Sequence, residues 1–184
     1  MATVAASSRS EAAFSSLGNG GFAGVWIKDH QESDSASYGR ACDLMGLSGL
    51  QKTTAMQLIE GVEIEQRGSR VAVQFLTMVP FFKVTETYTL GGVVTMARRD
   101  LRRGSQQACA AASPGGSLDV QITWAAPNAG TIKEQYRLVG RDTLECQSTV
   151  EVAAGSVTTR TVYRRSAGWR PRFQWNMVMR GSTG

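Results

Sequence analysis

The chain holds few residues of the types that carry out acid–base, nucleophilic or metal chemistry. His30 is the only histidine, so a Ser-His-acid triad would have a single base, and no nucleophile motif accompanies it. A metal site built on several histidines is excluded for the same reason. Cys42, Cys109 and Cys146 do not form a C-x-x-C pair, and Cys42 and Cys146 fit best as small apolar residues that pack inward. We therefore predict a protein that is not an enzyme and binds no metal and no cofactor.

Two carboxylates stand at positions where alternate residues are apolar. Glu86 lies between Val84 and Tyr88, and Glu134 shares its strand face with Tyr136. An unpaired buried carboxylate costs free energy, so each group must be partnered, protonated or exposed. We expect a bulge or a strand end to expose both.

The positive charge of the chain is concentrated at its C-terminal end. With 20 Lys and Arg against 15 Asp and Glu, the net charge is +5. No acidic residue follows Glu151 but six arginines do, so the first 151 residues sum to −1. A nearly neutral body with a basic end differs from a protein that coats nucleic acid over its whole surface. A second basic run, residues 98–103, is expected to be a solvated strand end and turn.

Residues 166–184 read as a basic, aromatic C-terminal extension. Arginines alternate there with large aromatic side chains, a composition that suits an acidic protein, an anionic membrane surface or single-stranded nucleic acid. The residues expected to contact such a partner are Trp169, Arg170, Arg172 and Trp175. Alternation of apolar residues over 173–179 also fits a further strand packed against the preceding domain.

Alternation of apolar and polar residues predicts a mainly β protein. The clearest case is residues 118–124, where Leu118, Val120, Ile122 and Trp124 alternate with polar residues, the pattern of a half-buried strand. The same pattern predicts ten strands, at residues 24–30, 62–65, 71–75, 82–90, 93–99, 106–112, 118–124, 132–139, 144–152 and 157–164. Ten antiparallel strands with one apolar face each must close or stack to hide that face.

Two short helices are expected between the first and second strands. Residues 36–45 place apolar side chains at i, i+3, i+4 and i+7, and Asp34 or Ser35 can cap them. Residues 50–59 form the second helical run. The simplest architecture is a ten-stranded antiparallel up-and-down β-barrel (β-clam) with a helix-turn-helix lid after the first strand, wide enough to enclose a small ligand.

Several short segments match one known family in their order and spacing. They are Gly24-Val-Trp26, the two helices around Leu44-Met-Gly46, the hairpin 61–68, Phe82-Lys-Val-Thr-Glu86, Tyr88-Thr-Leu-Gly91, Asp100-Leu-Arg102, Leu144-Glu-Cys146 and Thr159-Arg-Thr-Val-Tyr-Arg164. On the basis of these segments, the chain resembles the intracellular fatty-acid-binding and cellular retinoid-binding proteins of the lipocalin-like (calycin) superfamily over most of residues 24–165.

The resemblance implies a non-enzymatic, cytoplasmic and monomeric carrier of one fatty acid, retinoid or similar lipid. The family fixes an anionic head group with an Arg-x-Tyr pair on the last strand, but here Arg160 and Tyr163 are three apart. Strict alternation sends only one of them inward unless a bulge intervenes. If Glu86 and Glu134 face the cavity, the preferred ligand shifts to a neutral or cationic amphiphile. The expected ligand-binding residues are Tyr88, Trp124, Tyr136, Arg160, Thr161 and Tyr163. The expected portal residues are Tyr38, Leu44, Leu50 and Lys52.

The chain therefore divides into three expected segments. Residues 1–21 read as a flexible Ala/Ser/Gly-rich leader, or as a transit peptide that would place the protein in a plastid or other organelle. Residues 22–165 form the barrel and residues 166–184 the extension. One alternative function is a structural or interaction protein that uses the barrel as a scaffold and docks on an acidic partner through its basic end, without a physiological ligand. A lipocalin-like enzyme such as a pigment lyase is disfavoured by the small number of cysteines and histidines.

Overall fold

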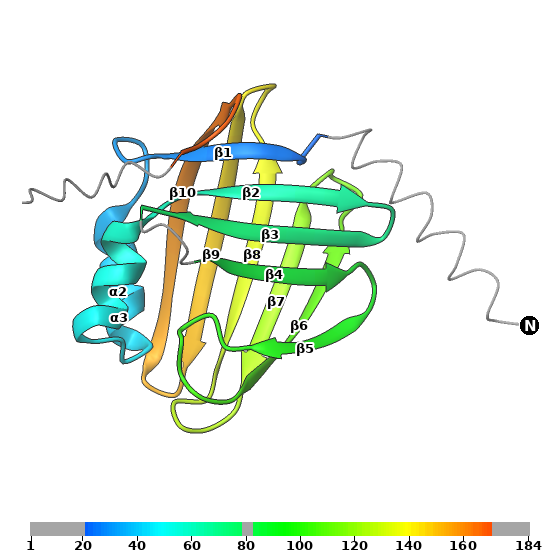
Figure 1. Ribbon diagram of the computed structural model, residues 1–184. Helices are drawn as coiled ribbons and strands as arrows, with labels where there is room; N and C mark the ends of the chain where they lie inside the picture. Colours follow the sequence, from blue (N-terminus) through cyan, green and yellow to red (C-terminus); the bar gives the residue numbers. More distant parts are fainter. Residues whose placement is uncertain (1–20, 79–82, 171–184) are drawn as a thin grey trace, which may run out of the picture.

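Ten antiparallel strands form one sheet that curls into a nearly closed barrel in the computed structural model, which describes residues 21–78 and 83–170 (Figure 1). This confirms the predicted fold class. The strands are β1 (Gly24–Asp29), β2 (Ile59–Arg67), β3 (Arg70–Thr77), β4 (Val84–Thr89), β5 (Val93–Ala97), β6 (Ser105–Ala112), β7 (Leu118–Trp124), β8 (Gly130–Leu138), β9 (Thr143–Val152) and β10 (Gly155–Ser166).

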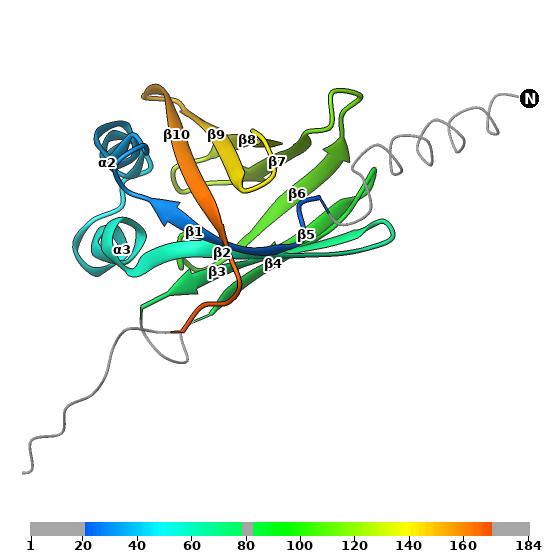
Figure 2. The same ribbon diagram turned by 90° about the horizontal axis from the view of Figure 1, so that it is seen from above.

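The barrel has two layers that cross one another. Figures 1 and 2 show β1 to β5 running across β6 to β10. The order in the sheet is β4-β3-β2-β1-β10-β9-β8-β7-β6-β5, so β1 joins the layers by pairing with both β2 and β10. Among the described residues no backbone ladder joins β4 to β5, the two ends of the sheet. Just after β4, the Gly91 N–H donates to the carbonyl oxygen of Ala110 on β6 over 2.8 Å.

Two short helices cover one end of the barrel (Figure 1). Helix α2 (Ser35–Leu44) begins after Asp34, whose carboxylate accepts a hydrogen bond from the Ser37 N–H over 2.9 Å and so satisfies a free donor of the first turn. Helix α3 (Gly49–Thr53) continues into one π-helical turn, η1 (Thr54–Leu58), and β2 follows at once. The two expected helices are therefore present, and the last turn of the second is wider than an α-helix.

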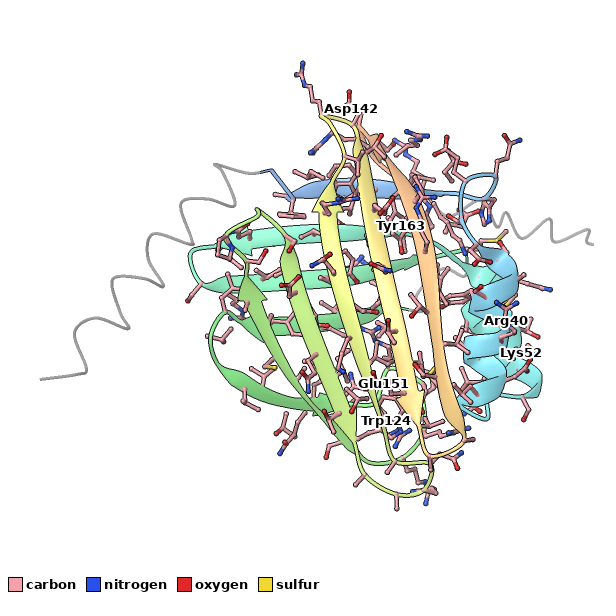
Figure 3. The ribbon with its side chains drawn as sticks, turned by 180° about the vertical axis from the view of Figure 1, so that it is seen from behind. Arg40, Lys52, Trp124, Asp142, Glu151 and Tyr163 are labelled. Atoms are coloured by element: carbon pink, nitrogen blue, oxygen red, sulfur yellow. The ribbon has the colours of Figure 1, made fainter. Side chains whose placement is uncertain are left out.

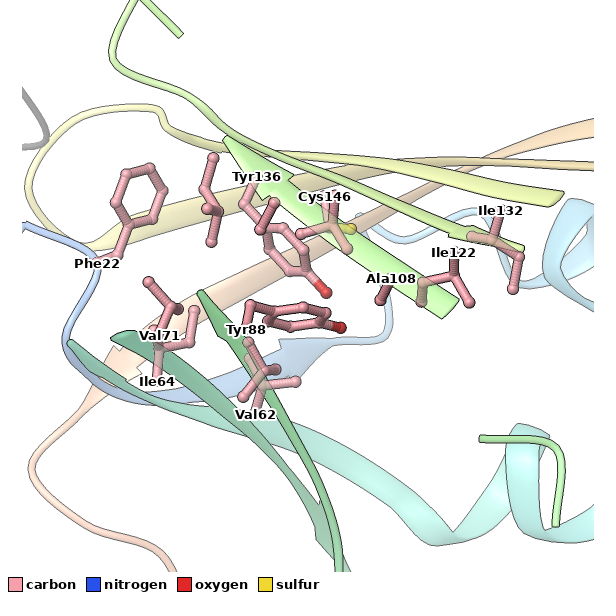
Figure 4. Close-up of a cluster of buried hydrophobic side chains, with 14 of the residues drawn as sticks. Phe22, Val62, Ile64, Val71, Tyr88, Ala108, Ile122, Ile132, Tyr136 and Cys146 are labelled. Atoms are coloured by element: carbon pink, nitrogen blue, oxygen red, sulfur yellow. The ribbon is translucent and has the colours of Figure 1, made fainter. Parts of the chain in front are cut away.

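The apolar faces of both layers meet inside the barrel. Figure 4 shows part of this core, in which the Tyr88 and Tyr136 rings come from opposite layers and direct their hydroxyl groups to the same side. Trp26 and Trp124 are buried, as predicted, and so are Cys42 and Cys146. The side chains that point inward from β7 are the alternating set Leu118, Val120, Ile122 and Trp124.

Candidate ligand-binding cavity

A cavity lies inside the barrel under the two helices. Its apolar lining comes from the lid and from strands of both layers: Ala41, Met45, Leu47, Ala55, Ile59, Phe75, Val84, Leu101, Ile132, Cys146 and Val150. Its polar lining consists of Lys28, Tyr38, Gln51, Thr54, Thr77, Arg99, Asp100, Glu134, Tyr136, Ser148, Thr159, Thr161 and Tyr163. The volume of the cavity that the centre of a water-sized molecule can reach is about 130 Å³. A single water requires only about 10–15 Å³ of such volume. The interior is therefore not filled by side chains alone.

Arg99, from the loop between β5 and β6, is one of the charged residues in the lining. Its Nε donates to Glu86 Oε1 over 3.0 Å, and its Nη2 donates to Glu86 Oε2 over 2.6 Å. The same guanidinium reaches Glu134: Nη1 donates to Oε1, and Nη2 donates to Oε2 over 3.1 Å. Glu86 lies on β4 and Glu134 on β8, so Arg99 joins two strands that the sheet order keeps far apart. We call Arg99, Glu86 and Glu134 the internal charge triad.

Neighbouring side chains complete the hydrogen bonds of the two carboxylates. The Tyr88 hydroxyl donates to Glu86 Oε2 over 2.6 Å, and the Gln106 amide donates to Glu86 Oε1 over 3.0 Å. The Tyr136 hydroxyl donates to Glu134 Oε2 over 3.1 Å. Gln106 also accepts from the backbone N–H of Arg99 over 3.0 Å. These bonds fix both carboxylates and the loop that carries the arginine.

The protonation of the internal charge triad follows from two opposing effects. Burial raises the pKa of the Glu86 carboxyl, but the charge of Arg99 and the hydrogen bonds from Arg99, Tyr88 and Gln106 outweigh burial and hold that pKa below its usual value. Burial lowers the pKa of Arg99, while the two glutamates raise it well above its usual value. Burial is also the main cause of the raised pKa of Tyr88. Glu86 and Arg99 are therefore held in their charged forms.

The internal charge triad corrects two predictions from the sequence. Glu86 and Glu134 are 2% and 8% exposed, so the expectation that a bulge or strand end exposes them is wrong. The run at residues 98–103 is not a fully solvated turn either, because Arg98 is 6% exposed and Arg99 enters the barrel. The signal for this site was present in the sequence: two carboxylates on inward faces require a cation that can reach them. The sequence did not show which arginine that would be.

The loop that carries Arg99 also holds the lid. Arg102 donates from Nη1 to the Met45 carbonyl oxygen over 2.9 Å, and from Nη2 to the Gly46 carbonyl oxygen. These carbonyls follow the C-terminus of α2, where a cation is favourable. The Asp100 carboxylate accepts from Arg98 Nε over 3.0 Å and lies 3.7 Å from Arg102 Nη1. One loop thus binds both the internal glutamates and the lid.

No sequence-family model and no curated protein sequence matches the chain. Solved structures do match in shape. Lipid binding protein 8 from Caenorhabditis elegans, without ligand, has a TM-score of 0.64 at 16% identity, covering 79% of this chain and 95% of the other. A fatty-acid-binding protein from Schistosoma mansoni in complex with arachidonic acid has a TM-score of 0.60 at 19% identity, covering 84% and 99%. The chain has the β-clam fold of the lipid-binding proteins.

This β-clam fold also occurs in a protein described as secretory. A secretory abundant heat-soluble protein from Ramazzottius varieornatus has a TM-score of 0.63 at 18% identity, covering 82% of this chain and 98% of the other. Within residues 21–78 and 83–170, no helix is both long and apolar enough to cross a membrane.

On the last strand of the β-clam, the inward residues differ from the family's Arg-x-Tyr pattern. Thr161 and Tyr163 line the cavity together with Tyr136. Arg160 lies on the outer face, where its Nε donates to Glu145 over 2.7 Å and its Nη1 donates to the Glu32 carbonyl oxygen over 3.1 Å. This corrects the expectation that Arg160 contacts the ligand: the strand keeps its alternation through Tyr163, so residues 160 and 163 face opposite sides.

Two other expected ligand residues are buried next to the cavity without lining it. Tyr88 holds Glu86, as described above. Trp124 lies in the core, where its Nε1 donates to the Asn128 carbonyl oxygen and the Arg98 guanidinium lies 5.4 Å from its ring centroid. Neither residue is part of the cavity lining, and direct contact of Tyr88 or Trp124 with a ligand stays a prediction.

The expected portal residues divide between the inner and outer faces of the lid. Tyr38 lines the cavity, and Leu44 is partly buried against the core. Leu50 is 78% exposed. Lys52 pairs with Asp43 on the outside of the lid, and Figure 3 shows Lys52 on the helices away from the strands. Only Tyr38 of the four reaches the cavity.

Lys28 is a cavity residue that the sequence reasoning missed. It lies on β1 opposite Tyr163, and its Nζ is 5.0 Å from the centroid of the Tyr38 ring. Among the described residues, no carboxylate lies within ion-pair distance of this amine. Burial lowers the pKa of Lys28. The period of two from the buried Trp26 was the available signal, because it places residue 28 on the inward face.

The structure describes only the first part of the basic extension. Trp169 donates from Nε1 to the Glu60 carboxylate over 3.1 Å, and Arg170 is exposed. Arg172, Trp175 and the proposed strand at residues 173–179 lie outside the described residues, as does almost all of the expected leader. Partner binding by these residues stays a prediction.

Proposed function

We propose that this protein binds one small hydrophobic molecule, a fatty acid, retinoid-like compound or other lipid, in the cavity under the lid, and that it does so without chemical turnover. The observation that supports this most directly is the cavity under the two helices, whose lining exposes mainly apolar surface although polar side chains take part in it. Burial of apolar ligand surface stabilises a complex by about 25 cal/mol per Å². A few placed polar groups then set the orientation of the ligand.

The residues proposed to touch the ligand come from both layers and from the lid. Tyr38 and Lys28 stand at the lid end, Thr161 and Tyr163 on β10, and Tyr136 on β8. The fatty-acid-binding protein from Schistosoma mansoni and the ileal bile-acid-binding protein from zebrafish hold arachidonic acid and cholic acid, respectively, in the same fold. These neighbours support a hydrophobic ligand for this chain as well.

We include a monomeric state and a cytoplasmic, carrier-type role in the proposal. The three cysteines are free thiols, which supports a reducing compartment. An organelle such as a plastid has thiol-reducing conditions too, so fractionation of the source cells must separate the two.

Native mass spectrometry of the full chain purified from its own source tests the proposal. We expect a complex heavier than the chain by the mass of one amphiphile, and the free chain after extraction with organic solvent. The empty chain as the only species, followed by no uptake of any added lipid, would instead favour a scaffold that docks on an acidic partner.

A further inference from the structure

The internal charge triad has few hydrogen-bonding positions left for a ligand. A guanidinium has five N–H donors. Four of those of Arg99 are used: Nε and one N–H of Nη2 on Glu86, and one N–H each of Nη1 and Nη2 on Glu134. One N–H of Nη1 remains. The cation that would bind a ligand carboxylate is therefore almost fully occupied.

The acceptor positions are similarly limited. A carboxylate has about four acceptor positions. All four of Glu86 are used, by Arg99, Tyr88 and Gln106. Glu134 accepts twice at Oε2, from Arg99 and Tyr136, and once at Oε1, from Arg99. Of the two glutamates, Glu134 lines the cavity, so the free position lies on a residue that a ligand can reach.

The remaining donor is on Arg99 Nη1 and the remaining acceptor position is on Glu134 Oε1. These two atoms are already hydrogen-bonded to each other. The two N–H groups of one NH₂ group point about 120° apart, so a single oxygen atom does not bridge the two positions. A hydroxyl group can fill either one, because it both accepts and donates, and it adds no charge to the site. A carboxylate can accept from Arg99 but has no hydrogen for Glu134, and its negative charge meets two glutamate side chains that share a single arginine. An ammonium can donate to Glu134 but cannot accept from Arg99.

We propose that the internal charge triad selects a ligand whose polar end is an uncharged hydroxyl group, in preference to a free carboxylate. This rests on the proposed function, because it names the ligand class of the same cavity. Arg99 or Glu134 touches the hydroxyl, and Glu86 acts through Arg99 by holding its position and adding a second negative charge beside it.

Calorimetric titration of the full chain, stripped of lipid, with 1-decanol, decanoate and decylamine tests this selection. The three probes share a chain length and differ at the polar end. We expect decanol to bind about tenfold or more tightly than decanoate at neutral pH, the size of one or two hydrogen bonds to a charged group. Glu134→Gln makes the triad neutral, and we expect it to reduce the decanol preference about tenfold, mainly through tighter decanoate binding.

The matched control is Glu151→Gln. Glu151 lies on the neighbouring strand β9, pairs with Lys133 outside the barrel and is 44% exposed. This variant should leave the preference unchanged. If thermal denaturation shows that Glu134→Gln is not folded, Glu86→Gln replaces it. This variant removes one negative charge from a residue behind the lining and should lower the preference for decanol over decanoate too. The relative affinities of the three probes for the wild-type chain test the selection without any variant.

The outcomes separate this inference from the proposed function. Equal or tighter binding of decanoate, or a preference that neither variant changes, would overturn the selection while leaving the cavity a lipid site. Tightest binding of decylamine would show that net charge, and not a hydroxyl group, sets the choice. If none of the probes binds and no lipid co-purifies, the proposed function fails together with the inference.

Discussion

Arg99 and Glu134 meet inside the barrel through two parallel hydrogen bonds, from Nη1 to Oε1 and from Nη2 to Oε2. Such a two-point contact fixes both distance and orientation. Glu134 lies on β8 and Arg99 on the loop after β5, and Glu86 continues the contact to β4. The ends of the sheet, which no backbone ladder joins among the described residues, are thus connected through buried charges.

Removal of the shared cation should destabilise the fold. Arg99→Met leaves two buried carboxylates facing each other, and we expect the free energy of unfolding to fall by about 3–5 kcal/mol. Urea denaturation at neutral pH measures it. Adding Glu86→Gln and Glu134→Gln to Arg99→Met should recover part of the loss. The control is Arg137→Met, an outer residue 59% exposed and paired with Glu145, which should cost less than about 1 kcal/mol. Similar losses in both variants would contradict the role of Arg99.

The lowered pKa of Glu86 makes stability depend on pH in a defined direction. A carboxyl with a folded-state pKa below its unfolded value of about 4.3 contributes stability that is fully present above that value. The contribution is lost as the pH falls through the folded-state pKa. Glu86→Gln should therefore be less stable than wild type near neutral pH, and the difference should shrink in acid. Urea denaturation between neutral and acidic pH measures it, and parallel curves would argue against a lowered pKa.

The bonds from Arg102 to the lid should control ligand exchange. Arg102→Ala removes the donors to the Met45 and Gly46 carbonyl oxygens. We expect faster backbone hydrogen exchange over residues 42–53 and faster ligand release in stopped-flow measurements, because the lid loses its contact with the β5–β6 loop. Arg103→Ala, at an exposed position of the same loop, serves as the control. An unchanged exchange rate in Arg102→Ala would show that other contacts hold the lid.

Lys28 should report on occupation of the cavity. Burial lowers the pKa of this amine, so a larger fraction of it is neutral and nucleophilic than at a solvated lysine. We expect acetylation by a small reagent, followed by mass spectrometry, to slow severalfold at Lys28 when 1-decanol is bound. Lys52 and Lys133, which pair with carboxylates outside the barrel, should react at the same rate with and without ligand. Equal protection of all three would indicate a general effect on the chain.

The strand pattern was readable from the sequence because burial repeats every second residue. The alternation at residues 118–124 corresponds to β7, and the inward positions of Tyr136 and Tyr163 follow the same rule. It also placed Glu86 and Glu134 on inward faces, although we expected irregular backbone to expose them. The alternation therefore gave the correct face for both glutamates, and the expectation that a buried carboxylate must be exposed was wrong.

The order of the strands along the chain, the place of the lid and the inward face of most strands could be predicted from the sequence, since they depend on local periodicity and on chain order. Which groups meet inside the barrel depends on how the sheet closes. Arg99 lies on a loop, where alternation gives no direction to a side chain, and its partners are 13 and 35 residues away along the chain. The closing of the sheet brings β4, β8 and the β5–β6 loop together. One arginine then pairs with both carboxylates and offsets the free-energy cost of burying them.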